Sequence, residues 1–465
     1  MTAPLPALDG TDAICLAPAV KLARLLRDGE LSSRELLAAY VSRTERLNSR
    51  INAIVTADFE AAHLAATAAD NIRARSSEPL GVLHGLPVSV KDSLAVGGLR
   101  STSGAIELAD YVPTFDAPAV SALRRAGAII FAKTNAPAWA ADIQTHNRLF
   151  GTTNNPWDTG RTTGGSSGGS AAAASVGLSA FDIGTDLGGS IRIPSSFCGV
   201  FGHKPTFGIV SQGGYLDCSE RRTGYAVEVD MNVVGPIARS ASDLLLAMTV
   251  LAGGAPWPVE AELKNLRIGV CVQDPYCHVD ERVARTISAA AESTASGEIS
   301  VELCSLPVSL ESVATMCSAL TLSAVSASLP DSVGTAIGGS HREWLVRNDD
   351  RSRMRAAWSE WFATFDALIC PIMPCVAFPH SIDSSLGELA LLVGDREIPA
   401  SRGLVWSQMA SLSYLPSTAI PVGLVDGLPV GAQAICRHGG DLMCLGIARM
   451  FERAGFRWTI PPLGN

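Results

Sequence analysis

Apolar and polar residues in the first part of the chain follow the period of helices. The apolar positions after residue 35 recur every three to four residues, which predicts an amphipathic helix. Ser32 and Glu35 have the spacing of a capping box at its start, and Leu31 and Leu36 are placed as a hydrophobic staple. The Ala-rich stretch at residues 58–75 predicts a second helix. The chain therefore opens with helices.

The period then changes to that of strands. Residues 86–90 form a short apolar run that ends in Lys91 and Asp92, and residues 128–132 form another. Residues 420–433 predict a closing pair of strands that returns to the core. Strands that alternate with helices indicate an α/β fold.

The pattern of the remaining chain sets the expected organisation. Residues 151–235 are rich in Gly and Ser, yet they contain strand-length apolar runs and an Ala-rich helix, so we expect folded core with tight turns. Residues 263–368 are less patterned, and we expect a strand at 266–272 followed by helices rich in Ala, Ser and Leu. No fixed-period repeat is present. We expect a single domain over residues 1–465. It comprises N-terminal helices at about 12–75, a core at about 60–260 and 411–465, and a cap that shapes a substrate channel at about 263–410.

Composition narrows the class of protein. Of 465 residues, 47% are hydrophobic and 17% charged, so the chain has enough apolar residues for a large core. The net charge of −9 argues against a nucleic-acid partner and against a basic membrane-binding surface. No apolar run reaches the roughly 18 residues of a membrane-spanning helix, and the N-terminus lacks the pattern of a secretory signal. We therefore expect a cytoplasmic protein.

Cysteine usage agrees with that compartment. The eleven cysteines include no Cys-x-x-Cys pair and no zinc-ligand spacing, so we expect reduced, mostly buried thiols, no metal site and no cofactor. Cys198 lies near the glycine-rich segments, but no neighbouring base in sequence would stabilise its thiolate, so we expect a buried thiol there too.

Three segments carry the candidate chemistry: residues 85–92, 164–170 and 184–192. The Gly-Gly-Ser-Ser-Gly-Gly-Ser sequence at 164–170 does not end in the Gly-Lys-Ser/Thr of a phosphate-binding loop. In the last segment, Gly188 and Gly189 allow a sharp turn that aims several N–H groups at one point, where Ser190 lies. A nucleophilic serine needs such donors, and it also needs a base.

The base has two kinds of candidate. His84 and His203 lie near these segments in sequence, but neither has the context of a Ser-His triad, and no Gly-x-Ser-x-Gly elbow is present. Lys91 ends an apolar run, where a strand would place a partly buried amine whose pKa is lowered by desolvation. Taken alone, Lys91 also fits a strand-end lysine paired with Asp92.

Together, these segments resemble the amidase signature family of serine hydrolases. The resemblance runs from about residue 28 to the C-terminus and includes residues 197–206 and 427–431. The 24 positions between Ser166 and Ser190 (190 minus 166) also match. The resemblance implies the α/β fold of that family, a mixed central β-sheet flanked by helices on both faces.

The resemblance also implies roles for individual residues. Ser190 matches the acylated nucleophile, Ser166 the bridging serine whose peptide bond is cis, and Lys91 the base. The oxyanion-hole N–H groups are those of Leu187, Gly188, Gly189 and Ser190. Supporting roles, including hydrogen bonds that orient the loop, fall to Ser167, Asp186 and Arg192. Residues that line the substrate pocket are Trp139, Ala141 and Gln144.

The implied activity is hydrolysis of an amide-type C–N bond in a small molecule, with water as the second substrate. Amides, aryl amides and carbamates (a urethanase activity) fit, and the enzyme acts as a monomer or homodimer. One alternative is the amidotransferase subunit of a tRNA-charging complex with protein and RNA partners. That branch usually carries an Asn-Leu-Asp-Glu-Phe-type stretch where residues 135–139 read Asn-Ala-Pro-Ala-Trp. An esterase on the same triad and a catalytically idle binding protein on the same fold are further alternatives.

Overall fold

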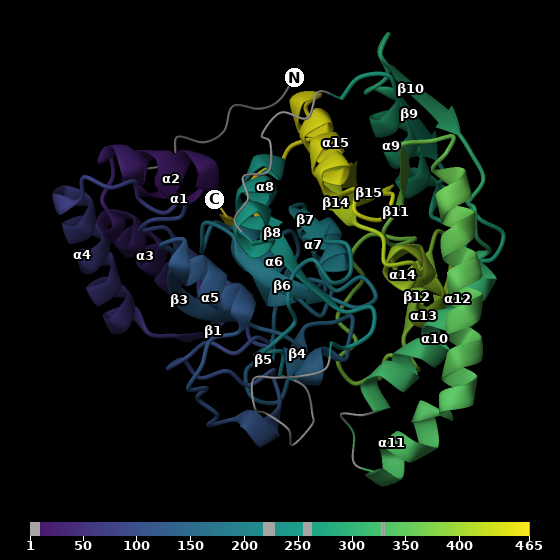
Figure 1. Cartoon of the computed structure of the whole chain (residues 1–465), viewed down its shortest axis with the longest axis horizontal. Helices are drawn as coiled ribbons and strands as arrows, with labels where there is room; N and C mark the ends of the chain where they lie inside the picture. The colour runs from purple at the N-terminus through teal and green to yellow at the C-terminus, as the bar shows by residue number, and fades with distance from the viewer. Residues whose placement is uncertain (1–9, 217–227, 254–262, 327–328, 330, 465) are drawn as a thin grey trace.

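The chain folds around one large mixed β-sheet (Figure 1). The computed structural model describes residues 10–216, 228–253, 263–326, 329 and 331–464. Residues 1–9, from which the absence of a signal was inferred, and Cys218 lie outside these ranges. The spatial order of the sheet is β1-β3-β2-β6-β8-β7-β14-β15-β11-β9-β10. Its strands are β1 (Ile54–Ala57), β2 (Pro87–Lys91), β3 (Ile129–Thr134), β6 (Asp182–Asp186), β7 (Phe201–Lys204), β8 (Val233–Ala238), β9 (Leu266–Val270), β10 (Ile299–Leu303), β11 (Ala367–Pro371), β14 (Ser417–Val425) and β15 (Leu428–Cys436).

The central strands are buried along their whole length. Every residue of β2, β3, β6, β8, β11 and β15 is buried, which requires that both faces of the sheet are covered. β3, β2 and β6 run parallel to one another, and the strands from β6 to β11 alternate in direction. The expected mixed sheet is confirmed.

Helices are the main regular elements of the described chain outside the sheet. They are α1 (Gly10–Cys15), α2 (Ala19–Asp28), α3 (Ser33–Ile51), α4 (Phe59–Arg75), α5 (Pro118–Arg125), α6 (Gly168–Ser175), α7 (Arg192–Cys198), α8 (Ala241–Leu251), α9 (Glu281–Glu292), α10 (Leu310–Ser326), α11 (Asp331–Gly338), α12 (His341–Trp361), α13 (Ala400–Gly403), α14 (Val405–Leu412) and α15 (Asp441–Arg453). Short 3-10 turns lie at Ile106–Leu108, Ala138–Ala140 and Pro462–Gly464. Two small hairpins complete the fold, β4 (His146–Asn147) with β5 (Gly151–Thr152) and β12 (Ala390–Val393) with β13 (Arg396–Pro399).

The two predicted N-terminal helices are present. The Ser32 hydroxyl accepts from the Glu35 N–H and the Glu35 carboxylate accepts from the Ser32 N–H, so the capping box opens α3 as expected. Asp58 caps α4 by accepting from Ala61 N–H. In Figure 1 these N-terminal helices lie on the opposite side of the molecule from α10–α12.

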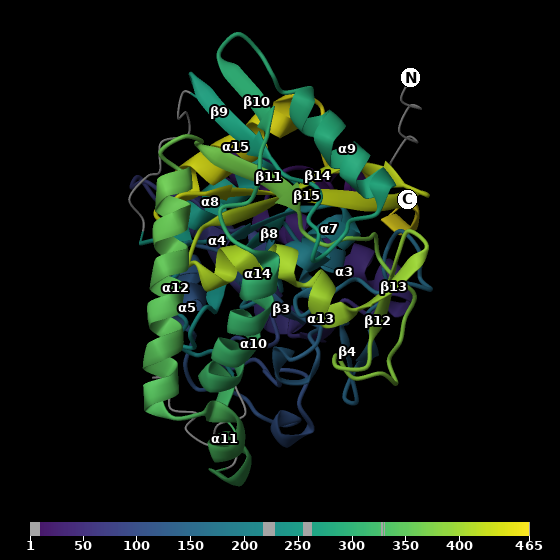
Figure 2. The same ribbon diagram turned by 90° about the vertical axis from the view of Figure 1, so that its right-hand side faces the viewer.

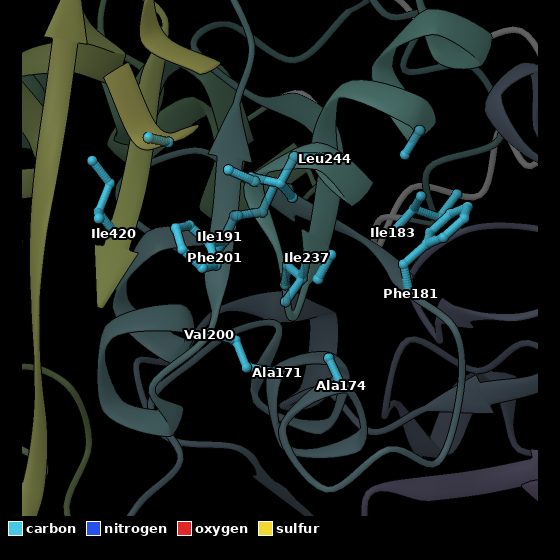
Figure 3. Packing of buried hydrophobic residues seen from close by; sticks show 14 of the residues in the cluster. Ala171, Ala174, Phe181, Ile183, Ile191, Val200, Phe201, Ile237, Leu244 and Ile420 are labelled. Carbon is cyan, nitrogen blue, oxygen red and sulfur yellow. The ribbon is translucent and has the colours of Figure 1, made fainter. Parts of the chain in front are cut away.

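The core fills the space between the sheet and its helices. α6 packs with α7, and α8 packs with α15, while each pair also contacts the central strands. Figure 3 shows part of this packing, with side chains that come from α6, β6, α8 and the strands beside them. Ala171 to Ala174 of α6 are all fully buried. Their small side chains let the helix pack closely in the core.

The late strand pair is also confirmed. β14 and β15 pair antiparallel from Ser417 to Val425, and they are joined by Asp426 and Gly427. Both of these residues have positive φ (51° and 76°), the geometry of a tight hairpin turn that Asp-Gly favours.

The region at 263–410 differs from the expected cap. Its strands β9, β10 and β11 extend the central sheet at one edge, with β11 paired to β15. Outside the sheet, this region contains α9, the helices α10–α12, the β12–β13 hairpin, α13 and most of α14 (Figure 2). The strand expected at residues 266–272 is present as β9. β10 and β11 were not predicted, and β10 is mostly exposed at the edge of the sheet without a continuous apolar run.

Within the described ranges, no helix is both long enough and apolar enough to cross a bilayer. The ten described cysteines are unpaired, and Cys304 alone among them is not buried. Reduced, mostly buried thiols were expected, and these ten agree.

Candidate active site

Lys91 lies at the end of β2 with its amine inside the protein. The side chain is fully buried. Its Nζ is 2.6 Å from Ser166 Oγ and donates to Thr185 Oγ1 at 2.8 Å. The neighbouring strand β6 places Thr185 beside it, and the segment before α6 places Ser166. Two of the three predicted triad residues are therefore in hydrogen-bond contact.

Burial changes the protonation of this amine. Loss of hydration lowers the pKa of Lys91 to about 7, although the carboxylates of Asp186 and Asp182 act in the opposite direction. The alternative pairing with Asp92 is not present. Asp92 accepts from Thr102 N–H at 3.1 Å and lies 3.9 Å from Lys133 Nζ. Near neutral pH, a large share of Lys91 is thus an uncharged amine able to accept a proton.

Ser166 follows a cis peptide bond, Gly165-Ser166, as the resemblance implies. Gly165 lies directly against the backbone of residues 142–144: a Cβ at this position would be 2.6 Å from the Asp142 carbonyl oxygen. Glycine is therefore required for this close approach of two backbone segments.

Ser190 is held next to this segment by backbone contacts. Ser167 N–H donates to the Ser190 carbonyl at 3.0 Å, and Ser167 Oγ donates to the Thr185 carbonyl at 3.2 Å. Ser167, the residue after Ser166, therefore contacts both the end of β6 and the loop that follows this strand. Ser190 itself is half-buried, so its side chain lies at the border between protein and solvent.

Asp186 organises this loop. It accepts from Gly189 N–H at 2.8 Å and from Ile191 N–H at 3.1 Å, and its Oδ1 lies 2.9 Å from Arg192 Nη2. Burial alone raises the pKa of a carboxyl, but the adjacent Arg192 guanidinium lowers the pKa of Asp186 to about 2. Asp186 is therefore a permanent anion that fixes the turn, in line with its expected supporting role.

The contact with Asp186 revises one expected oxyanion donor. The Gly189 N–H points at the Asp186 carboxylate and is not free to receive a developing oxyanion in this conformation. The N–H groups of Leu187, Gly188 and Ser190 have no hydrogen-bond partner among the described residues. Sequence reasoning treated all the N–H groups alike, because nothing in the motif indicates which one the buried carboxylate engages.

Arg192 connects the loop to distant parts of the chain. Its guanidinium donates to the Ser407 carbonyl at 2.7 Å, to Gln433 Oε1 at 2.8 Å and to Ser411 Oγ at 2.9 Å. Ser407 belongs to α14, which also limits Gly189: a Cβ there would lie 2.8 Å from the Ser407 Cβ, and φ is +127°. The glycine is needed for both reasons.

The histidines considered as alternative bases are engaged elsewhere. His84 Nε2 contacts the Ala69 carbonyl at 3.0 Å. His203 is buried between Thr418 Oγ1 at 2.8 Å and Asp441 Oδ1 at 3.2 Å, and burial lowers its pKa. His146 contacts Thr152 Oγ1 at 2.8 Å. Cys198 is a buried thiol, and its burial raises its pKa far above the usual range.

The three expected pocket-lining residues lie in different surroundings. Gln144 does not fit, because its amide is buried and both of its ends bond to the backbone of Ser381, at 2.9 Å each. Trp139 is half-buried against a small apolar cluster, and Ala141 is exposed. The role of these last two residues stays a prediction.

Several residues of the site were not singled out from the sequence. Thr185 precedes Asp186 in the Gly-Thr-Asp motif, so its position offered a signal that was not used. Ser407, Ser411 and Gln433 offered none, because they are separated from Arg192 by more than 200 positions along the chain.

Comparison with known proteins agrees with this geometry. The family model described as Amidase matches residues 35–445. A curated relative from Moorella thermoacetica, one of the subunits of its glutamyl-tRNA(Gln) amidotransferase, is 32% identical, over 93% of this chain and 96% of its own. A solved structure described as an amidase is 29% identical, with a TM-score of 0.80, over 94% of this chain and 99% of its own. A 6-aminohexanoate cyclic dimer hydrolase is 26% identical, with a TM-score of 0.81, over 97% and 99%.

The chain therefore belongs to the amidase family, and the resemblance seen in its motifs is confirmed. The curated relatives fit the alternative expectation, an amidotransferase subunit, better than that of a stand-alone hydrolase.

Proposed function

We propose that this protein cleaves the C–N bond of an amide through an acyl-enzyme on Ser190. The observation that carries the proposal is the 2.6 Å contact between Lys91 Nζ and Ser166 Oγ, made by a fully buried amine. The backbone bond from Ser167 N–H to the Ser190 carbonyl also joins the segment of the proposed relay serine to that of the proposed nucleophile. This arrangement supplies a base, a relay and a half-exposed serine in sequence.

The proposed acylation moves two protons. Ser190 Oγ attacks the carbonyl carbon and gives its proton to Ser166 Oγ, while Ser166 passes its own proton to neutral Lys91. The carbonyl π bond becomes an oxyanion, which the N–H groups of Leu187, Gly188 and Ser190 are placed to receive. When the C–N bond breaks, the proton returns through Ser166 to the leaving amine. Water then attacks the ester carbonyl carbon and gives a proton through Ser166 to Lys91. The C–O bond to Ser190 breaks, the proton returns through Ser166 to Ser190 Oγ, and the acid is released.

Two settings suit this chemistry. The first is a subunit of an amidotransferase that acts on glutamyl-tRNA(Gln), with partner subunits, and the curated relatives support it. The second is a stand-alone hydrolase of amides, aryl amides or carbamates. The Pro137-Ala138-Trp139 sequence, which departs from the amidotransferase pattern, supports the second setting. An esterase activity would use the same steps with an alcohol as leaving group.

The test of the shared chemistry is covalent labelling. A fluorophosphonate should add one adduct to Ser190 in the purified chain, and Ser190→Ala should abolish both labelling and turnover while the melting curve stays unchanged. Ser175→Ala is the matched control, because Ser175 is also a buried serine of α6 and its hydroxyl donates to the Cys198 carbonyl at 2.8 Å. Persistent turnover in Ser190→Ala would show that the nucleophile is misassigned.

A substrate panel separates the two settings. The chain alone is offered glutamine, an aryl amide, an aliphatic amide, a carbamate and an ester, and product masses are read directly. Rapid turnover of an amide or carbamate without a partner supports the stand-alone hydrolase. Glutamine hydrolysis that appears only with partner subunits supports the amidotransferase.

A further inference from the structure

A buried polar network lies on the strands that neighbour Lys91, β2, β3 and β6. Asp182, the first residue of β6, is fully buried. Its Oδ2 accepts from Ser89 Oγ at 2.6 Å and from Thr134 Oγ1 at 3.1 Å. Ser89 is the residue of β2 that pairs with Asp182, and Thr134 is the residue of β3 that pairs with Lys91. Because Ser89 and Lys91 are two residues apart on one strand, the carboxyl and the amine share a face of the sheet.

Asp182 is not neutralised by an ion pair. Its Oδ1 is buried with no hydrogen-bond partner, and no cation among the described residues lies within 4 Å of the carboxyl. The other buried carboxylates of this region have partners, since Asp92 faces Lys133 and Asp186 faces Arg192. Lys91 likewise has two hydroxyl contacts and no paired carboxylate. One unpaired acid and one unpaired base therefore occupy the same buried region.

We propose that Asp182 is a positioning residue whose buried carboxylate stabilises the ammonium that Lys91 becomes during acylation. The inference rests on the proposed function, because it needs Lys91 to accept the proton that leaves Ser190 through Ser166. No atom of Asp182 touches the reacting groups. It acts through its charge, which the hydroxyls of Ser89 and Thr134 hold in place.

The protonation of the two groups is consistent with this role. Burial raises the pKa of Asp182 to about 6 and lowers the pKa of Lys91 to about 7, so the carboxyl is mostly charged on the alkaline side of neutrality, where Lys91 acts as a neutral base. The other charged groups that the strands, loops and helices bring to this region are Asp186, Lys133, Asp92, Arg192 and Lys204. All of them except Lys204 belong to the ion pairs described above.

The chain offers an unusually clean measurement of Lys91. It contains five lysines, Lys21, Lys91, Lys133, Lys204 and Lys264, and the structure describes all of them. Protein labelled with ¹³C at the lysine Cε therefore gives at most five signals, and Lys91→Met identifies the one from Lys91. The titration is followed in Ser190→Ala protein, so that it reports the amine whether or not Ser190 is the nucleophile.

Asp182→Asn keeps the shape of the side chain and removes its charge. The ammonium form of Lys91 loses stabilisation, so its titration should move to lower pH by about 1 unit. In the active protein, the acid limb of fluorophosphonate labelling should move by the same amount in the same direction. Ser89→Ala, which removes one hydrogen bond from the carboxylate, should give a smaller shift of the same sign. It also provides a second variant if Asp182→Asn does not fold.

Asp243→Asn is the matched control. Asp243 is also a buried carboxyl with one unpartnered oxygen, but it accepts from Val20 N–H in a different part of the structure. Its substitution should leave the Lys91 titration unchanged.

The two proposals fail in different ways. An unmoved Lys91 titration in both Asp182→Asn and Ser89→Ala overturns the inference, even if Ser190 labels normally. Shifts as large in Asp243→Asn overturn it as well, because they would reflect a general loosening of the core. Absence of labelling at Ser190 in the wild-type protein contradicts the proposed function, while the coupling of Asp182 to Lys91 is still measured.

Discussion

Replacing Lys91 with methionine should remove the activity of the protein and make its stability less dependent on pH. Methionine has a similar unbranched length, so it fills the same buried space without a charge to desolvate. The lost contacts are those of the Lys91 amine with Ser166 Oγ and Thr185 Oγ1. Leaving such hydroxyls without a partner costs about 1–3 kcal/mol each, and this cost does not depend on pH between 7 and 9.

The stabilisation gained by removing the buried amine of Lys91, in contrast, depends on pH. The unfolded chain binds a proton at Lys91 up to its ordinary pKa of 10.5, whereas the folded protein releases it above about 7. Wild-type stability therefore rises with pH across this window, because the unfolded state binds more protons. At about 1.4 kcal/mol per unit, burial of Lys91 costs folding about 4 kcal/mol at pH 7 and about 2 kcal/mol at pH 9. The free energy of unfolding of Lys91→Met, measured relative to that of the wild type, should thus fall by about 2 kcal/mol between these two pH values.

The assay is urea unfolding at pH 7, 8 and 9, followed by tryptophan fluorescence, with refolding on dilution as the test of reversibility. Lys21→Met serves as the control, because Lys21 is exposed on α2 and its removal should give curves parallel to the wild type at every pH. Parallel curves for Lys91→Met itself would refute the reasoning, since they would mean that Lys91 is equally protonated in the folded and unfolded states.

Three further predictions concern the loop and the relay. Asp186→Asn should lower the free energy of unfolding by about 3–5 kcal/mol, because Arg192 is left as an unpaired buried cation, and it should slow labelling of Ser190. Asp158→Asn, in an exposed pair with Arg161, should change little in either measurement. Gly165→Ala should abolish labelling of Ser190, because the added Cβ would lie 2.6 Å from the Asp142 carbonyl oxygen. Gly160→Ala is the control, because its Cβ meets only the Asp158 side chain at 3.3 Å, and equal effects of the two variants on labelling would argue against this explanation. Initial rates with an amide substrate should rise about tenfold from pH 6 to pH 8 and then level off, as Lys91 loses its proton near pH 7, and a rate that falls over this range would point to an essential protonated group.

The sequence predicted the elements that depend on local patterns. The capping box of Ser32 and Glu35 starts α3 where expected, and the apolar run before Lys91 is a buried strand. These predictions succeeded because each depends on a few neighbouring residues. The site contacts made by Lys91 and Ser166 were expected only through the family resemblance, since the two residues are 75 positions apart.

The parts that could not be predicted depend on long-range packing. Nothing local indicates that Asp186 engages the Gly189 N–H, or that α14 supplies Ser407 and Ser411 to Arg192. That the strands at 263–410 extend the central sheet was not predicted for a similar reason. Their places in the sheet are set by their partners, β11 beside β15 and β9 beside β11, and not by their own composition.

The placement of the five lysines has a practical consequence for handling the protein. Lys91, Lys133 and Lys204 are fully buried, and only Lys21 and Lys264 of the five are exposed. Among the lysines, amine-reactive dyes, crosslinkers and biosensor surfaces will therefore attach through these two side chains, in a small set of defined orientations. The same reagents should leave the amine at position 91 unmodified as long as the fold is intact, so its acylation would report unfolding.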